Sequence, residues 1–250
     1  MSLSGLKPVY SEENGGNFMP ISPARGRVVG VVLLLQMALG LILPFVLIGP
    51  INVGSPGFLV HALSDASVIR AAVLVGFAGA ALCVVVSALS FPVIRQHSDT
   101  FAIALVSACT VSAALDAVHN GTVMSLLAMA KQAAALPLGD TSHLAAAAAV
   151  YSARVTAHYT QLFGFAWWLF VFYAAMFRTR LIPRPIAFIA IIAVAAQFIG
   201  VTLSHYLDYP MQGGWALPLA PIHAFSAIWM TVRGFGQTLT QQQMQNVEET

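Results

Sequence analysis

Long apolar runs separated by short polar stretches dominate this sequence. Each run is long enough, at roughly 20 residues, to cross a bilayer as a helix. The pattern predicts six membrane-spanning helices, which cover residues 27–50, 71–94, 100–124, 143–177, 185–206 and 215–232. The third is expected to continue as helix to Ala135, and the fourth is long enough to project beyond the bilayer or to bend. The predicted fold class is all-α, a polytopic membrane protein built as a bundle of six transmembrane helices.

Composition agrees with this pattern. Hydrophobic residues make up 58% of the 250 residues and charged residues 8%, with a mean hydropathy of +0.81. A soluble domain carries about 25% charged residues, so a soluble globular fold is excluded. The net charge of +2 arises from basic residues scattered among apolar runs, which argues against nucleic acid as a partner. Cys83 and Cys109 lie inside predicted spans, where a thiol acts as a small apolar side chain.

Basic residues gather on one side of the predicted membrane, and the positive-inside rule makes that side cytoplasmic. They are Lys7, Arg25, Arg27, Arg95, Arg178, Arg180, Arg184 and Arg233. The opposite side holds Arg70, Lys131 and, near the outer end of the fourth helix, Arg154. Both termini are therefore predicted to face the cytoplasm. We expect a disordered tail at 1–23, a transmembrane domain at 24–236, a second tail at 237–250 and the lipid bilayer as the main partner.

Ionisable side chains occur inside the third span. Ser112, Asp116, His119 and Asn120 follow one another at helical spacing, so they share one face. Such groups are costly in hydrocarbon, usually turn toward a protein interior or a wet cavity, and indicate a functional site by default. A rise of 1.5 Å per residue from Thr100 places Asp116 roughly 24 Å and His119 roughly 28 Å from the cytoplasmic boundary.

Three other helices carry a histidine of their own. Counting from the cytoplasmic ends puts His158 roughly 30 Å, His205 roughly 31 Å and His223 roughly 15 Å from the boundary. The fourth helix has a regular polar face, formed by Tyr151, Arg154, His158 and Gln161. The polar residues therefore cluster in depth, although periodicity alone does not say which helices are neighbours.

Histidines combined with a carboxylate are typical ligands of zinc, copper or iron. We therefore predict a His/Asp pocket in the outer half of the bilayer that binds a transition metal or haem. His119 and His158 are the expected cofactor ligands, His223 a further metal ligand, and Asp116 a metal ligand, an orienting group or a catalytic base. The chemistry is either hydrolysis of a lipid-like or small substrate or electron transfer. Interhelical hydrogen bonding without any cofactor is the alternative, since no close-spaced ligand motif occurs.

Two cofactor-free classes remain open. Pro218 and Pro221 precede His223 and would break the sixth span, as in transporters with discontinuous helices. The aromatic run 163–173 would suit a lipid face or contact with other subunits of a larger membrane complex. Gly76 and Gly79 are spaced for close helix contact. A retinal protein is excluded because no lysine lies in a span core.

The first half of the chain also resembles a known family. The resemblance is carried by Ala24-Arg25, Gly30, the Leu-rich first span with Gly40, the loop before Arg70, and the Pro92-Val-Ile-Arg95 end of the second span. These features are similar to a bacterial six-span family catalogued as domain of unknown function 4386. The resemblance implies a multi-pass protein of the bacterial inner (cytoplasmic) membrane, of this size and topology, with no established activity.

Overall fold

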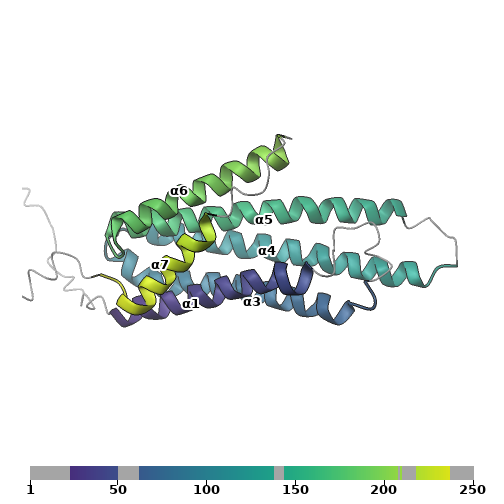
Figure 1. Cartoon of the computed structure of the whole chain (residues 1–250), viewed down its shortest axis with the longest axis horizontal. Coiled ribbons are helices and arrows are strands. Elements are labelled where there is room, and N and C mark those ends of the chain that lie inside the picture. Colours follow the sequence, from purple (N-terminus) through teal and green to yellow (C-terminus); the bar gives the residue numbers. More distant parts are fainter. Residues whose placement is uncertain (1–22, 50–61, 138–143, 208, 210–217, 237–250) are drawn as a thin grey trace, which may run out of the picture.

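The computed structural model describes residues 23–49, 62–137, 144–207, 209 and 218–236, and these residues form helices, with short turns at 96–98 and 180–183 (Figure 1). In chain order the elements are α1 (Pro23–Ile42) with its π-helical extension η1 (Leu43–Ile48), α3 (Ala66–Arg95), α4 (Asp99–Ala134), α5 (Leu144–Thr179), α6 (Arg184–Val201) with its π-helical extension η2 (Thr202–Tyr206), and α7 (Leu219–Arg233). The all-α prediction is confirmed.

Five of these helices are long and apolar enough to cross a membrane: Pro23–Ile48, Ala66–Arg95, Asp99–Ala134, Leu144–Thr179 and Arg184–Tyr206. The sixth helix, α7, has 15 residues. At 1.5 Å per residue it is roughly 22 Å long, shorter than the hydrocarbon thickness of about 30 Å. By contrast, the 36 residues of α4 and of α5 give each a length of about 54 Å, so both extend well past a bilayer.

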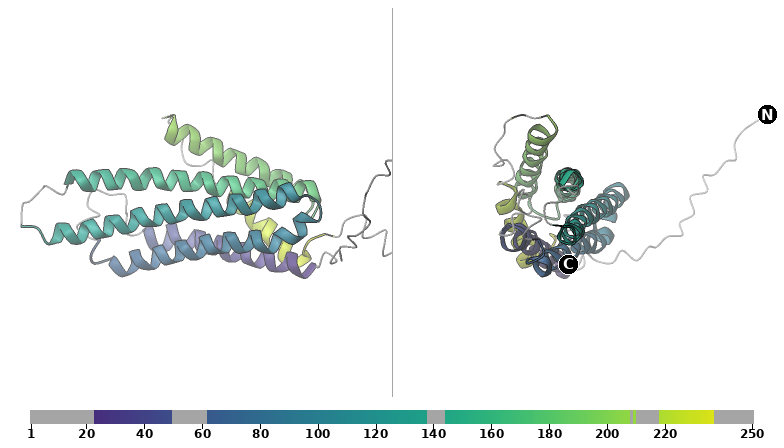
Figure 2. Two further views of the ribbon diagram at one scale, coloured as in Figure 1. Left: turned by 180° about the vertical axis from the view of Figure 1, so that it is seen from behind. Right: turned by 90° about the vertical axis from the view of Figure 1, so that its right-hand side faces the viewer.

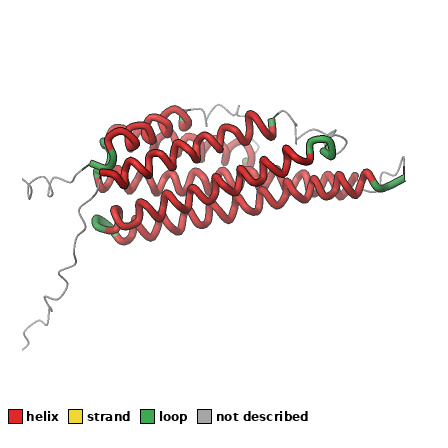
Figure 3. Tube along the Cα trace, turned by 90° about the horizontal axis from the view of Figure 1, so that it is seen from below, coloured by secondary structure: helices red, strands yellow, loops and turns green. Residues whose placement is uncertain are grey.

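Successive helices run antiparallel and pack on their neighbours. α3 contacts α1 and α4, α5 contacts α4 and α6, and α7 contacts both α1 and α6. Figure 3 shows the long helices side by side along the molecule, and the end-on view in Figure 2 shows α6 at the edge of the bundle. The short helix α7 crosses from α1 toward α6 and closes the bundle at one end (Figure 1).

The arginines predicted to share one side gather at one end of the bundle, whereas Lys7 lies outside the described residues. The turn between α3 and α4 holds Arg95, whose Nε donates to Asp99 Oδ1 over 2.9 Å. Ser98 caps α4 there, because its Oγ accepts the Phe101 N–H. The end of α7 reaches the turn between α5 and α6, where the Gly236 N–H donates to the Leu181 carbonyl over 2.9 Å. This end is hereafter called the basic end.

Two apolar cores lie along the bundle. The larger fills the half nearer the basic end and includes the fully buried Trp168, Phe172 and Tyr173 of α5. The smaller lies toward the far end, where α3 meets α4, and includes Ile69 and Leu126. The polar residues of α4 and α5 fall between these two cores in the chain.

Glycines set the closest helix contacts. A Cβ on Gly30 of α1 would lie 2.7 Å from the Ala227 carbonyl oxygen of α7, and Gly26, one turn earlier, meets the backbone at Phe235. Gly26 and Gly30 thus form a GxxxG interface, a signal that sequence reasoning overlooked. The prediction for Gly76 and Gly79 is half right: Gly76 lies against the Asn120 amide, but a Cβ on Gly79 would meet nothing within 4 Å.

Candidate polar site between two helices

Polar side chains of α4 and α5 meet at one level of the bundle. This polar layer consists of Asp116, His119 and Asn120 from α4 and Arg154, His158 and Gln161 from α5. Gln161 Nε2 donates to Asp116 Oδ1, and the His119 and His158 rings lie 5.2 Å apart, centroid to centroid, tilted by 46°. The residues predicted to cluster in depth on these two helices are therefore neighbours in space.

The layer lies far from the basic end. Asp116 is 17 residues after the start of α4 and His158 is 21 residues before the end of α5, so they lie roughly 26 Å and 32 Å along their helices. These distances approach the hydrocarbon thickness of about 30 Å. α3 lines the same level, because its Gly76 leaves room for the Asn120 amide.

Six buried polar atoms of the layer lack a hydrogen-bond partner among the described residues. Side-chain burial is deep, with His119 8% and Asn120 4% exposed. The buried atoms without a hydrogen-bond partner are His119 Nδ1 and Nε2, Asn120 Nδ2, Arg154 Nε, His158 Nδ1 and Gln161 Oε1. Buried polar groups are nearly always paired, with protein, water or a ligand, and an unpaired one costs several kcal/mol in hydrocarbon. Pairing of these atoms therefore requires water, a ligand or residues outside those described.

The end of α6 joins the edge of this layer. The His205 ring stacks on Tyr159 at 3.8 Å between centroids, with an angle of 17° between planes. The next residue, Tyr206, has its hydroxyl 3.1 Å from Thr160 Oγ1. His205 is thus connected to the layer through Tyr159, whose ring in turn lies 5.6 Å from that of His158.

His223 lies elsewhere. Its Nδ1 is 2.7 Å from the Tyr173 hydroxyl, and its ring packs edge-on to Trp168 at 6.5 Å. Because Tyr173 is 15 residues beyond His158 on α5, the two positions are roughly 22 Å apart along that helix. A metal site shared by these histidines requires His223 to lie beside His119 and His158. The structure instead places His223 at a different level of the bundle. Tyr173, its partner, was overlooked because one tyrosine in an aromatic run carries no distinguishing signal.

The donor set of the layer is small for a metal. No group of three or more His, Cys, Asp or Glu side chains that could hold a metal ion occurs among the residues that the structure describes. Zinc sites use at least three protein ligands. The layer reaches three only if both imidazoles and the Asp116 carboxylate, which Gln161 already contacts, turn to one point. The ligand and base roles of Asp116, His119, His158 and His223 stay predictions.

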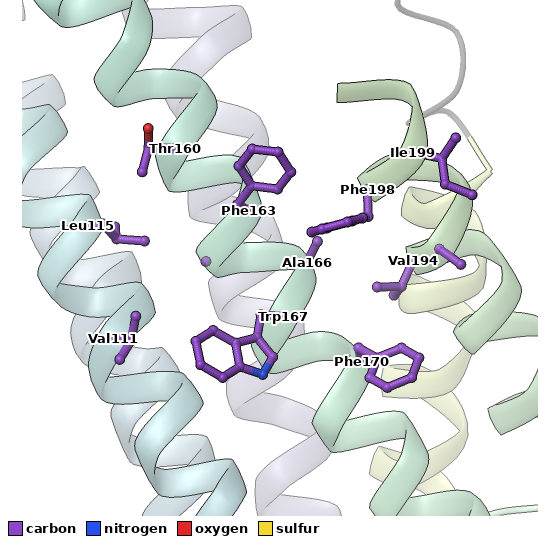
Figure 4. Close-up of a pocket in the computed structure, with 12 residues that line it drawn as sticks. Val111, Leu115, Thr160, Phe163, Ala166, Trp167, Phe170, Val194, Phe198 and Ile199 are labelled. Carbon is purple, nitrogen blue, oxygen red and sulfur yellow. The ribbon is translucent and has the colours of Figure 1, made fainter. Parts of the chain in front are cut away.

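An apolar groove of about 670 Å³ begins next to the layer and runs toward the basic end. Thr160 and Leu115, which line its outer end, directly precede Gln161 and Asp116 of the layer. Figure 4 shows the groove bounded by α4 on one side and α6 on the other, with α5 between them. The lining side chains are otherwise apolar and include Val111, Phe163, Trp167, Phe170, Val194, Ala195, Phe198 and Ile199.

A bundle of apolar helices long enough to cross a membrane, with a buried polar layer between two of them, defines this chain as an all-α integral membrane protein. A model of one family matches residues 28–234, which is most of the chain. The protein belongs to this family, which is described as a domain of unknown function (DUF4386). The resemblance in the first half is thus confirmed and extends through α7. Comparison with curated proteins and with solved structures finds no match.

Proposed function

We propose that this membrane protein binds an anionic, lipid-like molecule, with the head of the ligand at the polar layer and its tail in the apolar groove. The observation that carries the proposal is the set of unpartnered buried atoms on α4 and α5, at the level of the bundle where the groove has its outer end, since Asp116 and Gln161 directly follow the lining residues Leu115 and Thr160. An amphipathic ligand satisfies both features at once, because its head supplies hydrogen-bond partners and its tail fills apolar space.

Charge favours an anionic head. Arg154 forms no ion pair with a carboxylate among the described residues, and its guanidinium carbon lies 5.6 Å from the Tyr151 ring centre. Asp116, the carboxylate of the layer, accepts its hydrogen bond from Gln161 instead. A guanidinium presents several donors in a geometry that suits phosphate or carboxylate. Asn120 and the two imidazoles add neutral groups that can hydrogen-bond to the same head.

The proposal corresponds to a cofactor-free role, in transport of the ligand or as an accessory subunit of a larger membrane assembly. The His119 and His158 rings lie close together, so they could both bind one metal ion. Its further ligands would then come from outside the described residues. Metal analysis and an absorption spectrum of the purified protein test this directly. The decisive result would be stoichiometric zinc, copper or iron, or a Soret band, in the wild type and its loss in the double variant His119→Ala/His158→Ala. That result would replace the lipid proposal by the metal-centred one.

We also propose that the protein lies in the inner membrane of a bacterium, crosses it six times and has both termini in the cytoplasm. Residues 24–236 form the transmembrane domain, and 1–23 and 237–250 are tails. Most of both tails lies outside the described residues. The proposal is supported by the gathering of arginines at the basic end. The polar layer then belongs to the outer half of the bilayer, and the ends of α4 and α5 beyond it project to the outside.

Single cysteines at exposed positions test this topology. Ala134 lies at the far end of α4 and Arg180 at the basic end, and both are exposed. A membrane-impermeant maleimide is expected to label Ala134→Cys in intact cells, and Arg180→Cys only after the membrane is permeabilised. The opposite pattern would place the polar layer toward the cytoplasm.

Lipid binding is tested by native mass spectrometry of delipidated protein titrated with phosphatidylglycerol, which is anionic, or phosphatidylcholine, which is zwitterionic. We expect tighter binding of phosphatidylglycerol, and a loss of about tenfold in its affinity in Arg154→Gln, the value of one charge-assisted hydrogen bond. Arg178→Gln is the matched control, since Arg178 is exposed at the basic end. Ala195→Phe, which fills the groove, should weaken binding of both lipids. Equal phosphatidylglycerol affinities in Arg154→Gln and Arg178→Gln would refute the proposal.

A further inference from the structure

A second cavity, of about 240 Å³, lies among α1, α5, α6 and α7. It shares no lining residue with the apolar groove. Gln36 lies 13 residues into α1, Gln197 13 residues into α6, and His223 10 residues from the end of α7. At 1.5 Å per residue these positions are roughly 15–20 Å from the basic end, near the middle of a hydrocarbon layer about 30 Å thick.

Three polar side chains from three different helices line this cavity. Gln197 and His223 are each 4% exposed, and Gln36 Oε1 is buried without a hydrogen-bond partner among the described residues. Polar groups at this depth are expensive unless they are paired. Their convergence on one small cavity indicates a site for a polar ligand, and Gln36 Oε1, an acceptor, requires a donor from it.

The Tyr173 hydroxyl orients the imidazole. Nδ1 of His223 is 2.7 Å from this hydroxyl, so Nε2 is the ring nitrogen left for a ligand. A neutral imidazole has one donor and one acceptor nitrogen. When the phenol donates to Nδ1, Nε2 carries the proton and is a donor. The cavity then offers two amide groups and one N–H, all uncharged.

These walls select the ligand by charge, size and polarity. Among the described residues no Asp, Glu, Lys or Arg lines the cavity, so a charged ligand would find no counter-ion from them. A volume of about 240 Å³ equals about eight water molecules at roughly 30 Å³ each, which suits a substituted six-membered ring. Phe165, Leu41 and Leu219 provide apolar contact for the body of such a ring. Hydrogen-bond donors on separate helices suit a ring that carries carbonyl oxygens on opposite edges.

We propose that this cavity binds the head of a neutral, membrane-soluble quinone, one oxygen of which accepts a hydrogen bond from His223 Nε2 and the other from the Gln197 amide. In the reduced quinol, a hydroxyl donates to Gln36 Oε1. The site is independent of the lipid site at the polar layer. It is also near Trp168, whose ring packs against His223, so a bound quinone is expected to quench tryptophan fluorescence.

The test is a titration of the purified full chain in detergent with 2,3-dimethoxy-5-methyl-1,4-benzoquinone, followed by tryptophan fluorescence. We expect saturable quenching in the wild type. Gln197→Leu keeps the size of the side chain but removes its amide, so the affinity should fall about five- to thirtyfold, the effect of losing one buried hydrogen bond. Tyr173→Phe, which releases the imidazole, should also weaken binding.

Gly40→Leu provides a second, sterically based variant. Gly40 lines the cavity, and a Cβ there would meet nothing within 4 Å, so a leucine fits without displacing backbone and narrows the cavity at its wall. This variant should abolish saturable quenching, whereas Ala195→Phe, in the apolar groove, should leave it unchanged. Absence of saturable quenching in the wild type, or equal affinity in the wild type, Gln197→Leu and Gly40→Leu, would overturn the proposal. Because neither result involves Arg154 or phosphatidylglycerol, failure here is distinguishable from failure of the lipid proposal.

Discussion

The GxxxG contact between α1 and α7 allows a quantitative prediction for Gly30→Ala. The new Cβ would lie 2.6 Å from Thr231 Oγ1, 2.7 Å from the Ala227 carbonyl oxygen, and closer still to the Thr231 backbone nitrogen. Real Cβ atoms do not approach other heavy atoms this closely. Since two of the three neighbours are backbone atoms of a helix, no side-chain rotation relieves the overlap, and α7 must move away from α1.

The magnitude follows from two opposing effects. Overpacking of a close contact costs about 1–3 kcal/mol, whereas replacing glycine by alanine within a helix gains about 1 kcal/mol. The free energy of unfolding should therefore fall by up to about 2 kcal/mol. For a domain of this size each kcal/mol corresponds to about 2–4 °C in Tm, so we expect the Tm to fall by up to roughly 8 °C.

Thermal unfolding in detergent, followed by circular dichroism, measures the effect, and Gly79→Ala is the control. A Cβ on Gly79 would meet nothing within 4 Å, so this variant gains helix propensity without a clash and should have an unchanged or slightly raised Tm. If Gly30→Ala unfolds at the same temperature as Gly79→Ala or higher, α1 and α7 do not pack as closely as described, and the reasoning is refuted.

Two further predictions concern the spans themselves. In a double-mutant cycle, Asp116→Ala and Gln161→Ala should show a coupling of about 1.5–3 kcal/mol, because their hydrogen bond involves a carboxylate; additive effects would mean that the bond does not form. Cys83 and Cys109 are buried, so a soluble maleimide should modify neither thiol in the folded protein and both after denaturation in SDS. Rapid labelling before denaturation would contradict this burial.

Hydropathy predicted the helices well, because hydrocarbon requires every backbone group to be bonded within its own helix. It predicted the ends less well. The predicted sixth span began at 215, but its first residues lie outside the described part of the chain, and α7 begins at Leu219. The predicted second span began at Ala71, whereas α3 begins at Ala66. Residues before Ala71 are polar enough to lower hydropathy, yet they form helix because packing on the neighbouring helices favours it.

The candidate site was predictable only in part. Helical spacing placed Asp116 and His119 on one face, and depth matched His119 to His158. The same depth argument placed His223 near the middle of the membrane. That depth already differed from the depth calculated for His119 and His158. Its pairing with Tyr173 could not be derived, since many residues on other helices share that level.

The sequence by itself determined the class of protein, the helices and the depth of each polar residue, because all three depend on local hydrophobicity and on the constant rise of a helix. Only the tertiary structure decided which helices are neighbours, since each apolar face packs almost equally well against lipid or protein. Contacts such as Gly30 with α7 and Gln161 with Asp116 select one arrangement. In that arrangement His119 lies beside His158, and His223 lies apart from both. The apolar groove and the smaller cavity lined by Gln36, Gln197 and His223 lie between the helices.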